Sequence, residues 1–314
     1  MFVISVINAL APVILMIGLG VILKKAAFLD TTVCTGMNRF VYWVGLPCLL
    51  FHKIATATFS GGAALPIFYV LLITTGIVAC IAFLGSFWQE TSARGAFMQA
   101  AFRGNLAYVG LPIVFFSFSA ESATDADRMQ ALAVLAIAPL VPVYNVLAAI
   151  VLSSSQRRAG KRSAVFKKTL INVAENPLII ACVAGLFVKL SPIQIPLVFE
   201  RTFQALGDTA LPLALLGIGV SIATASIGGN FMTVFTASIL KLILSPLIAL
   251  AFSVLLGLSG QMTQIALILA ACPTAVASYV MAQQMGADAG LASRAVVVST
   301  VGAFPVFAVI LLAF

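Results

Sequence analysis

Residues 101–112 read AFRGNLAYVGLP and place a proline inside a long, mostly apolar segment. A proline within a helix removes one backbone hydrogen bond and clashes with the preceding turn. Hydrocarbon supplies no water to repair that loss, so such a break survives in a membrane only where protein buries it or where it lines a cavity. This stretch therefore predicts a broken membrane helix.

The same feature recurs along the chain. Pro47 and Pro112 lie in the first half, and Pro212 and Pro273 occupy corresponding places in the second half. Paired breaks in two halves are the best sequence pointer to the binding site of a transporter. We therefore expect Gly110, Pro112 and Pro273 to mark helix breaks beside such a site.

The composition excludes a soluble protein. The chain of 314 residues is 62% hydrophobic and 8% charged, and its mean hydropathy is +1.17. A soluble domain carries about a quarter charged residues. The expected class is an all-α polytopic membrane protein, in which about ten helices of about 20 residues each would fit.

The apolar windows predict spans at about 2–23, 36–54, 64–88, 95–118, 129–153, 169–190, 199–222, 231–257, 262–285 and 290–313. No basic residue precedes the first window, so we expect a retained helix rather than a signal peptide. Residues 1–154 would form a first five-helix repeat, 155–168 a basic linker and 169–314 a second repeat. An odd number of helices per half makes the two repeats inverted.

The positive charges indicate the orientation. The net charge is +8, and the linker holds Arg157, Arg158, Lys161, Arg162, Lys167 and Lys168. This cluster has no interleaved aromatic residues, so we expect a cytoplasmic loop facing lipid headgroups rather than a nucleic-acid site. Both termini would then lie outside a cell (inner) membrane.

The sequence predicts no cofactor, metal or ATP site. The five cysteines are scattered singly, without the spacing of metal ligands or of a disulfide framework. The chain contains no GxxxxGK[ST] motif, so direct drive by ATP is not expected.

Arg103 and Asn105 are the candidate site residues of the fourth predicted span. Arg103 is a charge within the membrane, which costs about 3 kcal/mol on insertion scales. It is interpreted either as an anion-binding or gating cation, or as a structural residue that pairs with Asp208 or extends to the interface. Asn105 would bind a ligand beside the break, or make a hydrogen bond between helices.

Further polar candidates lie in the second half. Thr274 and Ser278 follow Pro273, where they would complete an anion site or repair the broken backbone. Asp208 would carry a coupling proton, because burial raises the pKa of a carboxyl group, or it would cap a helix end. Lys241 is expected to be buried against a partner that the sequence does not name.

These residues resemble the signatures of the auxin efflux carrier family. The matching elements, in chain order, are Gly36 to Val41 with Pro47 and His52, Asn105 with Gly110-Leu111-Pro112, Asn176-Pro177, Leu206-Gly207-Asp208, and Pro273 to Ala282. The resemblance covers most of the chain in order, which makes it more specific than any single motif.

The resemblance implies a ten-helix, inverted-repeat carrier of the type shared with sodium/proton antiporters and bile-acid symporters. Helices four and nine would cross at their broken centres, and a homodimer is implied. In the plant members an asparagine of the fourth helix contacts the substrate carboxylate, and Asn105 occupies that position. The short linker, and Ser278 in place of a second proline, argue against auxin. The chain instead resembles the bacterial branch labelled malonate or malate permeases.

The expected function is secondary transport of small organic anions such as dicarboxylates, by alternating access. Arg103, Asn105, Thr274 and Ser278 would form the site, with a proton or sodium ion as the coupling ion. The alternative is a sodium/proton or sodium-coupled carrier, but such proteins place several acids at the crossing. An enzyme is not expected, because the chain offers one histidine and little else for acid–base or nucleophilic chemistry.

Overall fold

The computed structural model describes residues 2–57, 61–119, 121–154, 175–192, 194–225 and 230–314. The basic linker predicted at 155–168 lies outside the described residues. The chain forms two compact units, each drawn from both halves of the sequence. Unit 1 comprises Met1–Leu65, Ala107–Pro139 and Ala174–Thr224, and unit 2 comprises Pro66–Leu106, Leu140–Val173 and Ala225–Phe314.

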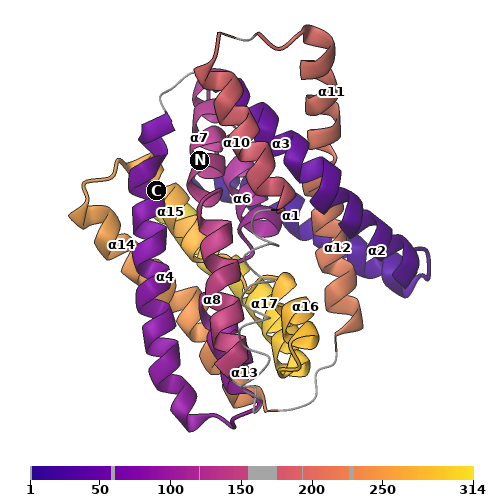
Figure 1. The fold of residues 1–314 in the computed structure, drawn as a ribbon, viewed down its shortest axis with the longest axis vertical. Coiled ribbons are helices and arrows are strands. Elements are labelled where there is room, and N and C mark those ends of the chain that lie inside the picture. Colours follow the sequence, from indigo (N-terminus) through magenta and orange to yellow (C-terminus); the bar gives the residue numbers. More distant parts are fainter. Residues whose placement is uncertain (1, 58–60, 120, 155–174, 193, 226–229) are drawn as a thin grey trace. The chain divides into compact units, whose positions relative to one another are not determined.

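The described backbone is built from helices, and many of them are apolar (Figure 1). Six helices in the described part are long and apolar enough to cross a membrane: Val6–Lys25, Gly62–Trp88, Ala123–Ser153, Leu197–Thr224, Phe231–Leu255 and Ala289–Ala313. Shorter apolar helices cover Leu106–Ser117, Pro177–Leu190 and Gly260–Ala270. This architecture is consistent with a polytopic membrane protein.

Unit 1 contains eight described α-helices: α1 (Phe2–Lys25), α2 (Thr31–Phe40), α3 (Leu46–Ala55), α6 (Leu111–Ser117), α7 (Ala123–Ile137), α10 (Pro177–Leu190), α11 (Leu197–Asp208) and α12 (Ala210–Thr224). The helix α1 packs against α12, and α3 packs against α10 and α11. Glycine allows the closest of these approaches, because a Cβ on Gly219 would overlap the carbonyl oxygen of Ile17 and lie 2.9 Å from the Cα of Gly20.

Unit 2 contains α4 (Leu65–Gly85), α5 (Arg94–Phe102), α8 (Leu140–Ser154), α13 (Phe231–Ile239), α14 (Ser245–Leu255), α15 (Gly260–Ala270), α16 (Ala277–Gln284) and α17 (Ala289–Ala313). The short α5 is central, since it packs against α8, α13, α16 and α17. Its residues from Gly95 to Phe102 are all buried.

Local capping explains where several helices begin. Asp30 accepts a hydrogen bond from the N–H of Val33 at the start of α2, and Asn176 caps α10 with Pro177 in its first turn. Asp288 caps α17 in the same way. Such side chains satisfy N–H groups that have no partner within the helix.

Three prolines follow five-residue π-helical segments: η1 (Val41–Gly45), η4 (Leu106–Gly110) and η6 (Leu240–Leu244). Each proline then lies in the first turn of the next α-helix, a position at which proline is common because its fixed φ suits a helix. The register shift is visible at Leu46 and Ser245, whose N–H groups donate to the carbonyls five residues back. Pro47 and Pro112 are therefore accommodated by a π-helical turn rather than by an open break.

The open breaks lie elsewhere, and both belong to unit 2. The chain leaves helical geometry at residues 103–105, here named the first interruption, and at residues 271–276, the second interruption. The first separates α5 from η4, and the second separates α15 from α16.

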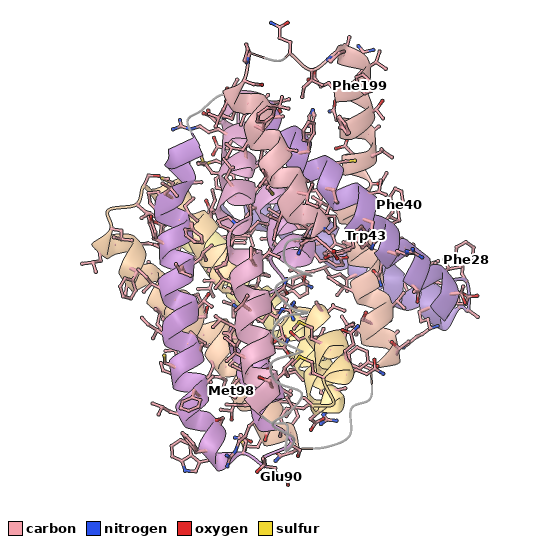
Figure 2. All side chains as sticks on the ribbon, viewed as in Figure 1. Phe28, Phe40, Trp43, Glu90, Met98 and Phe199 are labelled. Atoms are coloured by element: carbon pink, nitrogen blue, oxygen red, sulfur yellow. The ribbon has the colours of Figure 1, made fainter. Side chains whose placement is uncertain are left out.

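Large apolar side chains also remain on the outside. Phe28, Trp43 and Phe199 of unit 1 are labelled in Figure 2, and they are 74%, 56% and 58% exposed. A water-soluble protein rarely exposes so many large apolar groups together. Such a surface suits contact with lipid.

Candidate functional site

The two interruptions pair with each other within unit 2. The N–H of Asn105 donates to the carbonyl of Pro273 at 2.8 Å, and the N–H of Ala275 donates to the carbonyl of Arg103 at 3.0 Å. These bonds form an antiparallel bridge between Gly104 and Thr274. Each broken helix leaves backbone groups without partners, and the other interruption supplies those partners. In hydrocarbon an unpaired backbone group would be costly, because no water is present to bind it.

Side chains anchor this bridge on both flanks. The hydroxyl of Thr274 donates to the carbonyl of Ala100 in α5 at 2.8 Å. The N–H of Thr274 donates to the hydroxyl oxygen of Ser299 in α17 at 2.9 Å. The hydroxyl proton of Thr274 is thus committed to a carbonyl of another helix, α5, and its role in binding a ligand stays a prediction.

Arg103 is buried, with 6% of its surface exposed. Its Nη2 donates to Oδ1 of Asn145 in α8 at 2.6 Å, and its Nη1 contacts Sδ of Met281 in α16 at 2.8 Å. Both of these partners are neutral groups, and they orient the guanidinium group.

Two other predicted residues offer polar groups beside the bridge. Asn105 contributes its backbone N–H to the pairing, and the role of its side-chain amide in binding a ligand stays a prediction. Ser278 stands in the first turn of α16, and its Oγ is fully buried without a hydrogen-bond partner. Gln99, one turn before Arg103 in α5, is also fully buried, and neither its Nε2 nor its Oε1 has a partner. Unsatisfied buried polar atoms require an explanation, and a ligand provides one.

Lys241 on η6 reaches the same region. Its Nζ donates to the carbonyl of Ala270, the last residue of α15, at 2.7 Å, and the hydroxyl of Ser245 donates to the same carbonyl at 3.0 Å. A Cβ on Gly104 would lie 3.2 Å from both Cε and Nζ of Lys241. The absence of a side chain at Gly104 therefore lets the lysine lie against the first interruption.

The remaining predicted residues belong to unit 1. Gly110 ends η4, and Pro112 stands in the first turn of α6; both belong to unit 1. Asp208 is the last residue of α11, also in unit 1, and it is exposed. Its role in proton coupling stays a prediction. In the described residues, no group of three or more His, Cys, Asp or Glu is placed to hold a metal ion.

From the sequence we did not single out Gln99, Asn145 or Ser299, and we named no partner for Lys241. Asn145 orients Arg103, Ser299 holds Thr274, and Lys241 contacts the end of α15. Each is a polar residue within an apolar segment, and that isolation was the available signal. Their partners lie on other helices, so the sequence pattern did not reveal them.

Comparisons with known proteins agree on one class. Residues 5–311 match the family model described as "Membrane transport protein". A protein of Rhizobium meliloti (strain 1021) with the printed name "Putative malonate transporter" is 24% identical over 268 residues, which cover 84% of this chain and 82% of the relative. An "Uncharacterized transporter" of Methanothermobacter thermautotrophicus is 24% identical over 293 residues, 92% of each chain.

Proposed function

The chain belongs to the membrane transport protein family, the family of the auxin efflux carriers, and we propose that it is a secondary carrier of small organic anions. The family and the relatives are transporters, so the protein is a transporter and not an enzyme.

The observation that carries the proposal is the charge of the buried residues around the paired interruptions. Arg103 and Lys241 are 6% and 1% exposed, and both are basic. The acids of unit 2 are Glu90 and Asp288, which lie in an exposed turn and at the cap of α17. Two buried basic side chains beside the paired interruptions favour an anionic ligand, because a coupled cation would need acidic ligands.

In this proposal Arg103 attracts a carboxylate and Asn105 orients it through the side-chain amide. Ser278 completes the site with its unpartnered hydroxyl, and Thr274 holds the two interruptions together. The paired backbone holds these side chains in place, since each interruption is bound to the other by hydrogen bonds. Small dicarboxylates such as malonate or malate are the proposed substrates, in keeping with the name of the Rhizobium relative.

For the transport cycle we propose alternating access in a fold of ten helices arranged as two inverted five-helix repeats, 1–154 and 169–314. The linker 155–168 would be cytoplasmic. The chain passes from unit 2 to unit 1 directly after Leu106, at the end of the first interruption. A movement of one unit against the other would therefore act on the residues that bind the anion.

Thermal stabilisation of the purified protein tests this proposal, since a ligand that binds only the folded state raises its stability. Malonate or malate should stabilise the wild type, and Arg103→Ala and Asn105→Ala should abolish that effect while remaining monodisperse. Gln284→Ala, at an exposed position of α16, is the control. Stabilisation by sodium alone would contradict the anion proposal and favour a cation-coupled carrier.

A further inference from the structure

Lys241 carries a buried ammonium group with few hydrogen-bond acceptors around it. Its side chain is 1% exposed, and its hydrogen bond goes to the Ala270 carbonyl. An ammonium group has three donors, and that carbonyl already accepts a second bond from Ser245. In the part of the chain that the structure describes, no carboxylate lies within 4 Å of its Nζ.

The helices around Lys241 add no negative charge. Its segment η6 packs against α5, α13, α14 and α17. The charged residues on these helices are Arg94 of α5 and Arg294 of α17, and Arg103 follows α5. Cys272 of the second interruption is a titratable group near its ammonium. A buried cation in such surroundings is costly unless an anion compensates for it.

The location of Lys241 indicates where that anion would bind. Its Cε and Nζ lie against Gly104, between Arg103 and Asn105 in the chain. Arg103 is oriented by α8 and α16, whereas Lys241 comes from η6. Lys241 therefore lies against the backbone of the first interruption, to which Arg103 itself belongs.

We propose that Lys241 supplies a second positive charge to the anion site, and that this charge makes the carrier select doubly charged over singly charged carboxylates. The inference rests on the proposed function and names its substrate class. Attraction between opposite charges is strong in a site that excludes water. A dianion gains from both cations, whereas a monoanion is held by one.

The test compares malonate with acetate at pH 7.5, where malonate carries two charges. Binding to the purified protein is measured by calorimetry for the wild type and for Lys241→Met, which keeps an apolar stem and removes the charge. We expect the variant to lose at least tenfold in malonate affinity and less than threefold in acetate affinity. Lys189→Met is the matched control, because the Lys189 ammonium also donates to a backbone carbonyl, that of Ala57 in unit 1, at 2.8 Å.

A second variant keeps the charge and moves it. Gly104→Ala adds a Cβ 3.2 Å from the lysine Cε and Nζ, so the ammonium must shift, and the preference for malonate should fall. An unchanged malonate-to-acetate preference in either variant would overturn the role of Lys241 and leave the anion carrier intact. If the wild type binds neither anion, the proposed function itself fails.

Discussion

Replacing Ser299 by alanine removes the acceptor of a buried backbone N–H in the second interruption. The Ser299 hydroxyl accepts the N–H of Thr274 at 2.9 Å and donates to the carbonyl of Ala295 at 2.5 Å. The next residue is a matched control. Thr300 is equally buried, and its hydroxyl donates to the carbonyl of Val296 at 2.6 Å.

The two substitutions differ in one respect. Ser299→Ala and Thr300→Val each delete a hydroxyl that donates to a carbonyl four residues back in the same helix, where that carbonyl can keep its helical bond. Only Ser299→Ala also leaves a backbone donor unpaired. An unsatisfied buried donor costs about 1–3 kcal/mol, and polar contacts in membrane proteins fall at the lower end because the unfolded chain finds other partners. We expect Ser299→Ala to lose about 1–2 kcal/mol more than Thr300→Val, a factor of about 5–30 in the folded-to-unfolded ratio.

Unfolding in mixed detergent micelles measures this difference, with the denaturant midpoint of each variant compared with the wild type. Malonate stabilisation should also weaken in Ser299→Ala, because Thr274 loses one of its two anchors. Equal midpoints for the two variants would refute the reasoning, since the Thr274 N–H would then have no need of Ser299.

Three further predictions concern packing, backbone repair and surface charge. Gly219→Ala should destabilise unit 1 by about 1–3 kcal/mol, because the new Cβ meets the backbone of α1. Gly18→Ala is the control and should not destabilise it, because nothing lies within 4 Å of the Cβ it adds. The thermal unfolding midpoints of the two variants measure the difference. Thr274→Val should cost about 1 kcal/mol by removing a bond to a carbonyl of α5, and Thr274→Ser should retain most of the wild-type midpoint. Lys53 and Asp127 form an ion pair of 2.7 Å, and the aspartate side chain is 69% exposed. Neutralising both residues should change the free energy of unfolding by less than about 1 kcal/mol. A larger loss would show that the pair is shielded from water.

The sequence alone determined that this protein is a membrane protein of a transporter family. The hydropathy predicted a membrane protein, and the ordered signatures from Gly36 to Ala282 predicted the transporter family, which the family match confirms. Hydropathy placed two helix starts at about 36 and 169, whereas the caps Asp30 and Asn176 start helices at Thr31 and Pro177; a cap depends only on a side chain and N–H groups within a few residues. Composition, local capping and ordered motifs are all properties of the chain itself.

The tertiary structure decided how the breaks are made and what satisfies them. Pro47 and Pro112 were expected to open their helices, but a π-helical turn before each proline accommodates it. The open interruption lies instead at Arg103 to Asn105, where the chain could leave the helix because Pro273 and Ala275 supply backbone partners.

The same distinction applies to the candidate site. The sequence identified Arg103, Asn105, Thr274 and Ser278 as polar residues in apolar spans, and their ligand-binding roles remain predictions. That Lys241 lies against Gly104, and that Ser299 holds Thr274, could be learned only from the packed helices. A polar residue in a membrane span is visible in the sequence, but the atoms that satisfy it lie on other helices, and only packing brings them within hydrogen-bonding distance.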